Sequence, residues 1–264
     1  MQDLTVSLIQ ADTFWHDPDA NRAMFEEFIW SIETDTDLII LPEMFTTGFT
    51  MEASVVSEPD NGPTFRWMKN LAQQLNSVIT GSIIVKSNQG YFNRLIWMEP
   101  DGSYQSYDKR HLFRFAQEDE TYSAGKDKLI KELKGWKVNP QICYDLRFPV
   151  WSKNRYEEKA GFNYDLLLFV ANWPAARVSA WDSLLRARAI ENSAYVIGVN
   201  RVGKDGKDIS YNGHSGVYDP KGGEKVFLDN EITTKTITLS KKELDSYRHK
   251  FQVHKDWDSF DLRN

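Results

Sequence analysis

The sequence is short of three things: cysteine, long apolar stretches and clustered basic residues. Its single cysteine, Cys143, cannot form an internal disulfide, which argues against a secreted domain held together by such bonds. No stretch reaches the roughly 18 uninterrupted apolar residues of a membrane-spanning helix, so no membrane partner is expected. A net charge of −6, without basic runs or basic–aromatic interleaving, argues against a general nucleic-acid binder.

The sequence also has neither a leader pattern nor a cluster of metal ligands. The N-terminal stretch MQDLTVSLIQADTFW reads as a strand and lacks the basic start of a signal peptide, so the expected location is the cytoplasm. Histidine, cysteine and acidic residues do not recur at metal-ligand spacing, so neither a metal nor another cofactor is expected.

What the chain does contain is a regular alternation of apolar runs and amphipathic stretches. Apolar residues make up 41% of the 264 residues, enough for one large domain over 1–264. The alternation is typical of an α/β protein. Strands are expected at 4–10, 37–43, three between 77 and 109, 136–145, 164–173, 195–203, two in the hairpin 214–229, and 232–240. Helices are expected at 21–34, 62–76, 179–194 and 241–251.

Each half of the chain has the order strand, helix, strand, with further strands added. Two such sheets packed face to face predict a four-layer α-β-β-α sandwich. Asp19 is expected to cap the first helix, and Pro63 to stand at the start of the second. The C-terminal tail, 252–264, has little apolar periodicity. It is expected either to lie over the domain or to reach a partner chain.

Three reactive side chains stand at the ends of expected strands. Cys143 ends QICYD, Glu43 ends LIILPE, and Lys109 precedes HLF in YDKRHLF. A thiol, a carboxylate and an ammonium supply the nucleophile, the base and the oxyanion cation that amide hydrolysis through a thioester requires. If the fold brings them together, they predict a cysteine-dependent hydrolase.

The turn after Cys143 is expected to assist this chemistry. A helix beginning there would lower the pKa of the thiol and direct the backbone N–H of Tyr144 at the developing oxyanion. The residues alone leave other interpretations open. One of the histidines, His111, His214 or His249, could instead pair with the thiol. A lone cysteine on an apolar strand is also more often a small buried side chain than a nucleophile.

Three segments taken together narrow these alternatives. LPEMFTTGF, YDKRHLF and ICYDLRFP resemble, in this order, the signature segments of the nitrilase superfamily, the carbon–nitrogen hydrolases. The resemblance extends from VSLIQAD through RARAIENSAYVIGVNRVG to SGVYDPKG. It implies the α-β-β-α sandwich and a Glu–Lys–Cys triad made of Glu43, Lys109 and Cys143.

The same resemblance implies a second glutamate beside the triad and a second subunit. FAQEDETYSAG offers Glu118 and Glu120, and the spacing to Gly125 favours Glu118, whose expected role is to hold Lys109 and the attacking water. At least a homodimer is implied, in which the helix at 179–194 and the turn after the cysteine meet the partner subunit.

Within the superfamily, KRHLFRFA, CYDLRFP and ANWP are most similar to the omega-amidase branch. That likeness implies hydrolysis of the terminal amide of small 2-oxo dicarboxylic monoamides, 2-oxoglutaramate and 2-oxosuccinamate, to dicarboxylate and ammonia. Hydrolysis of N-carbamoyl amines or aliphatic amides by the same triad is one alternative. A non-catalytic binding protein with the same fold is an alternative of another class.

An anionic 2-oxo acid requires a cation in its pocket. Arg147, four residues after Cys143, is the candidate, because a guanidinium binds a carboxylate through two parallel hydrogen bonds. Trp173 of VANWP is expected to form a wall of the pocket, with Phe45 and Phe115 as further wall candidates.

Overall fold

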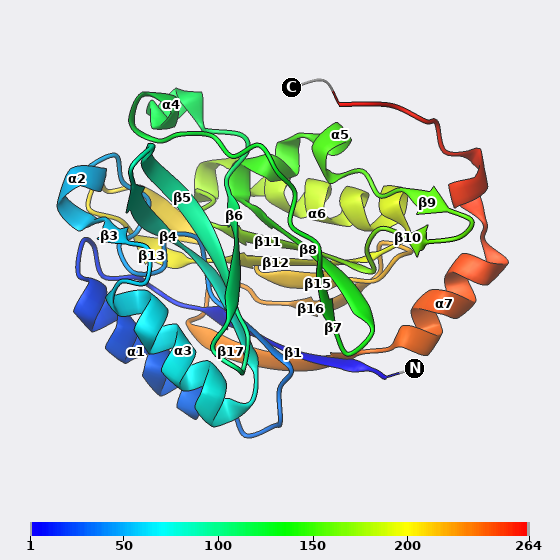
Figure 1. Ribbon diagram of the computed structural model, residues 1–264, viewed down its shortest axis with the longest axis horizontal. Coiled ribbons are helices and arrows are strands. Elements are labelled where there is room, and N and C mark those ends of the chain that lie inside the picture. Colours follow the sequence, from blue (N-terminus) through cyan, green and yellow to red (C-terminus); the bar gives the residue numbers. More distant parts are fainter. Residues whose placement is uncertain (1, 263–264) are drawn as a thin grey trace.

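The computed structural model describes residues 2–262, which form two β-sheets packed face to face between layers of helices (Figure 1). Helices α1 (Pro18–Trp30) and α3 (Pro63–Leu75) pack on the outer face of the first sheet, and α6 (Val178–Asn192) packs on the outer face of the second. Strand β1 lies against β12, and β5 against β8, across the interface between the sheets. The expected four-layer α-β-β-α sandwich is confirmed.

The first sheet has the strand order β17-β1-β2-β4-β5-β6, with β3 paired to β4. Its members are β1 (Leu4–Gln10), β2 (Leu38–Ile40), β3 (Glu58–Pro59), β4 (Val78–Ser87), β5 (Gly90–Met98), β6 (Tyr104–Asp108) and β17 (Thr233–Leu239). The second sheet has the order β16-β15-β12-β11-β8-β7. Its members are β7 (Lys131–Leu133), β8 (Trp136–Ile142), β11 (Leu166–Ala171), β12 (Tyr195–Asn200), β15 (Gly216–Tyr218) and β16 (Glu224–Phe227).

Both sheets have a parallel centre. In the first sheet β1, β2 and β4 are parallel neighbours, and in the second β8, β11 and β12 are. Parallel strands present their carboxyl ends at one edge of a sheet, which is where side chains that follow such strands can converge. The candidate residues at 43 and 143 both follow strands of this kind.

Alternation along the central strands divides the core into two layers. Leu38 and Ile40 of β2 point into the cluster between the sheets, whereas Ile39 and Leu41 point toward α1 and α3. A strand buried on both faces therefore appears in the sequence as the continuous apolar run LIIL rather than as an alternating pattern.

The residue that caps helix α1 differs from the expected one. The side chain that caps α1 is Asp17, whose Oδ1 accepts the backbone N–H of Ala20 at 3.0 Å, so the expected cap at Asp19 is wrong. Asp19 lies inside the first turn and pairs with Arg22. Pro63 begins α3 as expected, since its missing N–H is not needed there.

The remaining elements are short and mostly surround the strand ends. They are α2 (Ala53–Val56), α4 (Glu118–Thr121), α5 (Pro149–Ser152) and α7 (Lys241–Lys250), the hairpins β9–β10 (Tyr156–Glu157, Gly161–Phe162) and β13–β14 (Val202–Lys204, Ser210–Asn212), and four 3-10 helices (Arg114–Ala116, Cys143–Arg147, Ala175–Arg177, Val253–Asp256). Within residues 2–262, none of the helices has the length and apolar character needed to cross a membrane.

The C-terminal tail lies over the chain itself. The ring of His254 packs 4.3 Å from that of Tyr156, and the Lys153 ammonium lies 3.7 Å from the centre of the Trp257 ring. Figure 1 shows the tail running from α7 around the outer side of the β9–β10 hairpin and then past α5. Of the tail expected at 252–264, residues 263–264 lie outside the described part of the chain.

Candidate active site

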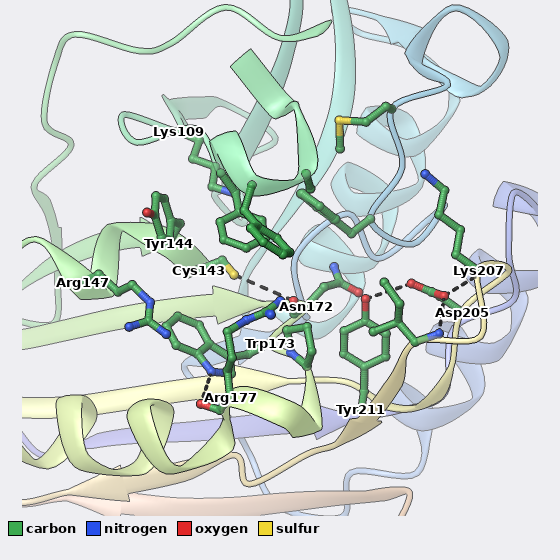
Figure 2. Close-up of a pocket in the computed structure, with 17 residues that line it drawn as sticks. Lys109, Cys143, Tyr144, Arg147, Asn172, Trp173, Arg177, Asp205, Lys207 and Tyr211 are labelled. Carbon is green, nitrogen blue, oxygen red and sulfur yellow. Dashed lines mark hydrogen bonds between the residues drawn. The ribbon is translucent and has the colours of Figure 1, made fainter. Parts of the chain in front are cut away.

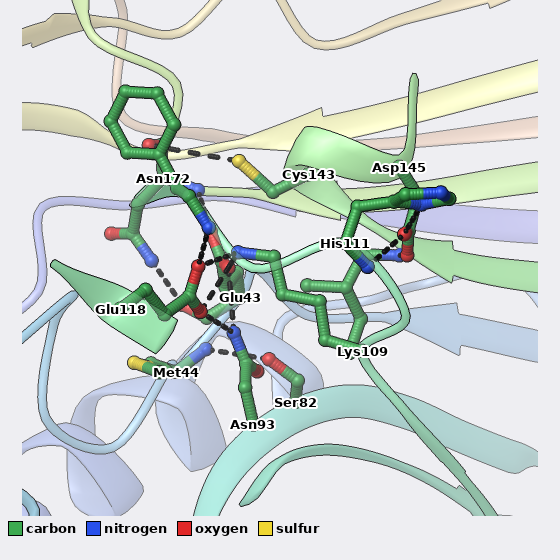
Figure 3. Close-up of polar contacts among 12 residues, drawn as sticks. Glu43, Met44, Ser82, Asn93, Lys109, His111, Glu118, Cys143, Asp145 and Asn172 are labelled. Atoms are coloured by element: carbon green, nitrogen blue, oxygen red, sulfur yellow. Dashed lines mark hydrogen bonds and ion pairs between the residues drawn. The ribbon is translucent and has the colours of Figure 1, made fainter. Parts of the chain in front are cut away.

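Glu43, Lys109 and Cys143 converge from both sheets onto one point. Glu43 follows β2 and Lys109 follows β6 in the first sheet, whereas Cys143 follows β8 in the second. The Lys109 ammonium donates to Oε1 of Glu43 at 2.9 Å (Figure 3). The Cys143 thiol faces the same cluster and lies 3.9 Å from the carbonyl oxygen of Asn172. The three residue types required for thioester chemistry are thus brought together.

The Glu43 carboxylate is fully buried and fixed on both oxygens. Its Oε1 also accepts from Asn93 Nδ2 at 2.8 Å, and its Oε2 accepts from the backbone N–H of Asn172 at 2.7 Å. The side chain of Asn172 in turn donates to the Glu43 carbonyl at 2.6 Å. Because these partners come from β5 and from the end of β11, the carboxylate has one orientation, directed at the cysteine side of the cluster.

Glu118 completes the cluster. Lys109 donates to its two carboxylate oxygens at 3.0 and 2.9 Å, and the backbone N–H of Phe113 donates to one of them at 2.6 Å. Glu120, the other candidate from the sequence, is exposed and contacts Gln117 instead. The structure therefore places Glu118, and not Glu120, beside Lys109.

Gly125 is required where this loop returns to β6. A Cβ atom at this position would lie 2.0 Å from the carbonyl oxygen of Asp108, far inside van der Waals contact. The backbone N–H of Gly125 donates to the Lys109 carbonyl at 2.9 Å. The glycine thus lets the loop that carries Glu118 close tightly around Lys109.

The charges of the cluster stabilise one another. Burial alone disfavours a charged Lys109, but the carboxylates of Glu118 and Glu43 outweigh it and raise the pKa of the ammonium above its ordinary value. Burial raises the pKa of Glu118, and the Glu43 charge adds to this, while Lys109 offsets part of it. Lys109 is therefore a permanent cation at the reacting point.

The thiol differs from expectation. Burial raises the pKa of Cys143 well above its ordinary value, the Glu43 carboxylate raises it further, and Lys109 lowers it only in part. The expected lowering by a following helix is wrong, because the chain forms only a five-residue 3-10 helix there and the thiol is just 8% exposed. The resting thiol is consequently protonated at neutral pH and needs a base when it reacts.

Three left-handed backbone positions lie at this site. Cys143 itself has a φ of 45°, Met44 a φ of 42° and Gln117 a φ of 59°. Side chains other than glycine rarely adopt this region, and such strain clusters at functional sites. Each of the three turns the chain sharply at, or directly beside, a member of the cluster, which aims that side chain at the common point.

The histidines lie elsewhere. The His111 ring stacks on Phe148 at 3.7 Å and its Nδ1 pairs with Asp145, while His214 pairs with Asp182. His249 is exposed on α7. Within residues 2–262, none of the three contacts the thiol, so the structure does not form a cysteine–histidine pair. No group of three or more potential metal ligands is assembled in the described chain either.

A cavity of about 260 Å³ opens over Cys143 (Figure 2). Much of its wall is apolar, and it includes Phe49, Met51, Phe113, Trp173, Pro174 and Ile209. Cationic side chains also line it, from Arg147, Arg177 and Lys207. A small chain with an anionic end fits such a lining, because the apolar wall covers its methylene groups and the cations bind its charge.

Most of the substrate-binding residues expected from the sequence line this cavity. The Arg147 guanidinium lies 4.8 Å from the centre of the Trp173 ring, and both residues face the cavity together with Tyr144. Phe115 lies at the mouth and is 84% exposed. Tyr144, the residue after Cys143, lines the same cavity, and the role expected for its backbone N–H stays a prediction.

The expectation for Phe45 is wrong. The left-handed turn at Met44 carries Phe45 to the other side of the first sheet, where its ring packs against Phe25 of α1 and Trp67 of α3. It is fully buried in the layer between sheet and helices and does not line the cavity.

Sequence reasoning missed several residues of the site. Asn93, Asn172 and Arg177 were not assigned any role. Asn172 had a signal, because a polar side chain that ends the apolar run LLLFVAN stands where parallel strands deliver functional groups. Asn93 also had a sequence signal, since it is a polar residue inside an otherwise strand-like stretch. The structure shows that this position is fully buried. Arg177 had none, because one arginine ahead of an amphipathic helix is common.

Comparisons with known proteins agree with this geometry. The family model described as carbon-nitrogen hydrolase matches residues 5–248. The chain is 45% identical over 263 residues to the protein of Escherichia coli K12 named omega-amidase YafV, covering 99% of this chain and 100% of that protein. It is 33% identical to the 2-oxoglutaramate amidase of Bacillus subtilis (strain 168), with 83% of each covered.

A solved structure has nearly the same fold. It is XC1258 from Xanthomonas campestris, described as a CN-hydrolase superfamily protein with an arsenic adduct in the active site. The two chains are 47% identical and superpose with a TM-score of 0.97 over 100% of each.

Proposed function

The chain belongs to the carbon-nitrogen hydrolase family of the nitrilase superfamily, and from that membership we propose that it is an omega-amidase acting through a Cys143 thioester. It hydrolyses the terminal amide of small 2-oxo dicarboxylic monoamides, 2-oxoglutaramate and 2-oxosuccinamate, to the dicarboxylate and ammonia. The observation that carries this proposal is the buried Glu43–Lys109 pair, with a contact of 2.9 Å, beside the single thiol at the inner end of a cationic cavity.

The first half-reaction forms the thioester. Glu43 takes the proton of the Cys143 thiol while the sulfur attacks the amide carbon, which avoids a free thiolate in the resting site. The Lys109 ammonium and the Tyr144 backbone N–H bind the oxyanion of the tetrahedral intermediate. Glu43 then returns the proton to the amide nitrogen, the C–N bond breaks, and ammonia leaves.

The second half-reaction releases the acid. Glu43 removes a proton from a water molecule, which attacks the thioester carbon, and the same two groups bind the new oxyanion. The C–S bond breaks, the sulfur recovers its proton from Glu43, and the dicarboxylate departs. Glu118 holds the Lys109 ammonium between two carboxylates throughout, so the cation does not move when the oxyanion forms.

Substrate selection follows from the size and charge of the cavity. Its volume of about 260 Å³ suits a chain of a few carbons rather than a peptide. Arg147 binds the carboxylate of the substrate at the end opposite the amide, held in place by its stacking on Trp173. Phe115 covers the mouth of the cavity.

The free thiol favours a reducing compartment. A cysteine nucleophile must stay reduced, which favours the cytoplasm.

We also propose a homodimer formed through α6 and the turn after Cys143, where Val150 and Ile190 are 51% and 48% exposed. Sedimentation of the full chain, with a Val150→Glu variant as the disrupted form, measures this directly.

Ammonia release tests the proposed reaction. The wild-type chain should cleave 2-oxoglutaramate and 2-oxosuccinamate far faster than glutamine, aliphatic amides, N-carbamoyl amines or nitriles. Cys143→Ala should reduce turnover to background while its thermal unfolding stays close to that of the wild type. The intermediate should appear as a covalent mass increase on Cys143 after acid quenching.

Two results would contradict the proposal. Undiminished turnover in Cys143→Ala removes the thioester route. A preference of the wild type for N-carbamoyl amines or simple aliphatic amides assigns the same triad to the alternative substrates.

A further inference from the structure

Arg177 places a second guanidinium in the cavity. The residue ends the 3-10 helix Ala175–Arg177 immediately before α6, and its carbonyl accepts the indole N–H of Trp173 at 2.8 Å. Its backbone is thus tied to the wall on which Arg147 stacks. Figure 2 shows the Arg177 side chain directed into the cavity, toward the end that holds Cys143.

The Arg177 guanidinium is positioned by aromatic rings rather than by acids. It lies 5.2 Å from the centre of the Phe113 ring and 5.7 Å from that of Phe115. Within residues 2–262, no ion pair joins it to a carboxylate. A guanidinium that stacks on rings keeps its in-plane N–H donors available, so these donors face the space that the substrate occupies.

The cavity contains more positive charge than one carboxylate requires. Asp205 is the only acid in its lining apart from the Glu43–Glu118 cluster behind it, counted over the described residues. Its oxygens already accept from the Tyr211 hydroxyl and from the backbone N–H groups of Lys207 and Ile209. Arg147 and Arg177 are therefore both available to one small substrate.

We infer that Arg177 donates to the 2-oxo oxygen of the substrate while Arg147 binds the neighbouring carboxylate. This inference rests on the proposed omega-amidase function and identifies Arg177 as the residue that recognises the 2-oxo group. The oxygen is a hydrogen-bond acceptor adjacent to the carboxylate, so two planar donors on one wall match the 2-oxo acid unit. Arg177 touches the substrate but takes no part in bond breaking.

The same contact predicts that other amides are poorer substrates. A plain methylene at the 2 position offers no acceptor and leaves the guanidinium donors unpaired. The ammonium of a 2-amino acid has only donors and the same sign of charge as Arg177, so it is repelled. Glutamine is consequently excluded by charge and not by shape.

Matched substrate pairs test this inference. The kcat/KM of wild type, Arg177→Gln and Arg177→Lys should be measured on 2-oxosuccinamate and on succinamate, which lacks only the 2-oxo oxygen. Arg177→Gln should lose about 10- to 100-fold on 2-oxosuccinamate and less than about threefold on succinamate, as expected for one hydrogen bond from a charged donor. The preference for 2-oxoglutaramate over glutamine should narrow in the same variant, and Arg177→Lys should recover part of the loss.

Lys207→Gln is the charge-matched control. It removes one positive charge from the rim, so both substrates of a pair should be affected by the same factor. Binding of 2-oxosuccinate and of succinate to Cys143→Ala, with and without Arg177→Gln, gives a second measurement that does not depend on turnover. Only 2-oxosuccinate should bind more weakly to the double variant.

Three outcomes overturn the inference. Equal losses on both substrates of a pair show that Arg177 supplies general attraction only. An unchanged kcat/KM in Arg177→Gln shows that it makes no contact. A wild type that cleaves neither 2-oxo amide defeats the proposed function, and the role of Arg177 with it.

Discussion

Cys143 is the residue on which the proposed chemistry depends. Burial and the Glu43 carboxylate raise the pKa of Cys143, so the free protein holds a thiol rather than a thiolate. A protonated sulfur is a weak nucleophile, and most stray electrophiles find it unreactive. In the proposed mechanism, attack on an amide is possible only when Glu43 accepts the proton at the same moment, which confines the reactivity to molecules bound correctly in the cavity.

Glu43→Gln should separate the acidity of this thiol from catalysis. The substitution removes the larger of the two carboxylate charges that raise the thiol pKa, so that Lys109, which lowers it, is opposed only by Glu118. Alkylation by iodoacetamide should therefore reach its half-maximal rate at a lower pH than in wild type. Ammonia release should nevertheless fall by about 10²- to 10⁴-fold, because the base is gone. The pH profile of alkylation and the amidase assay measure both effects.

Glu120→Gln is the control for this substitution, because that carboxylate is exposed and lies outside the Lys109 cluster. Its alkylation profile and its turnover should match those of wild type. An alkylation midpoint that moved upward in Glu43→Gln would contradict the electrostatic account of the thiol.

The triad could be assigned from the sequence through its resemblance to a known family, whereas a residue beyond a sharp turn could not be placed. Glu43 and Cys143 follow apolar strands and Lys109 follows the polar strand YQSYD, so it was the three segments together that identified them. Phe45 lies only two positions past Glu43, yet the left-handed backbone of Met44 sends it into the opposite layer. No propensity or periodicity marks a methionine for that conformation, so the error has a local physical cause.

At the scale of elements, α7 is attached to the second sheet through a buried ion pair. Asp165 accepts from Arg248 of α7 at 2.5 Å and from Lys241 at 2.6 Å. Burial disfavours the ionised carboxyl, but the two cations outweigh it and hold the pKa of Asp165 below its ordinary value. Its contribution to stability is therefore present above the ordinary aspartate pKa and is lost as the pH falls through the lowered pKa.

Asp165→Asn should accordingly destabilise the chain in a pH-dependent manner. At pH 7 the free energy of unfolding should fall by about 3–5 kcal/mol, because Arg248 remains buried without its partner. The difference from wild type should shrink as the pH is lowered below the ordinary aspartate range. Urea denaturation at several pH values measures it, with the exposed Asp127→Asn expected to change stability by less than about 0.5 kcal/mol. A difference independent of pH would refute the ionic role.

Long elements were predictable and short ones were not. The helix at 62–76 and the longer strands of both sheets follow from apolar periodicity, and α3 and β4 lie where that periodicity places them, whereas β3 and β7 of these sheets were not expected. The hairpins β9–β10 and β13–β14 have strands of two or three residues. Such strands contain too few residues to show an alternation of apolar and polar side chains. They are stabilised by packing on the surfaces they cover rather than by their own sequence.

At the scale of the whole molecule, the tail covers aromatic surface on the second half of the chain. Trp257 packs on Phe162, whose ring also lies 3.8 Å from the Arg248 guanidinium. Deleting residues 253–264 should lower the free energy of unfolding by about 2–4 kcal/mol through the lost apolar burial. The kcat on 2-oxoglutaramate should stay within about twofold, since none of residues 253–262 lines the cavity over Cys143.

Sedimentation of the deleted form distinguishes the two places expected for the tail. An unchanged subunit number with reduced stability assigns the tail to its own chain. Unchanged stability with a halved mass would instead assign it to the contact between subunits.

Glu43 also joins the two halves of the sandwich, through two hydrogen bonds with Asn172 that link the chain after β2 to the chain after β11. The proposed base of the reaction is thus also a polar contact between the two layers, in addition to others such as the hydrogen bond from Tyr107 to Asp145. Loss of turnover should therefore report loss of the contact between the two sheets. On heating, the fraction of remaining activity and the fraction of folded protein should fall with the same midpoint. No folded but inactive state should be populated between them.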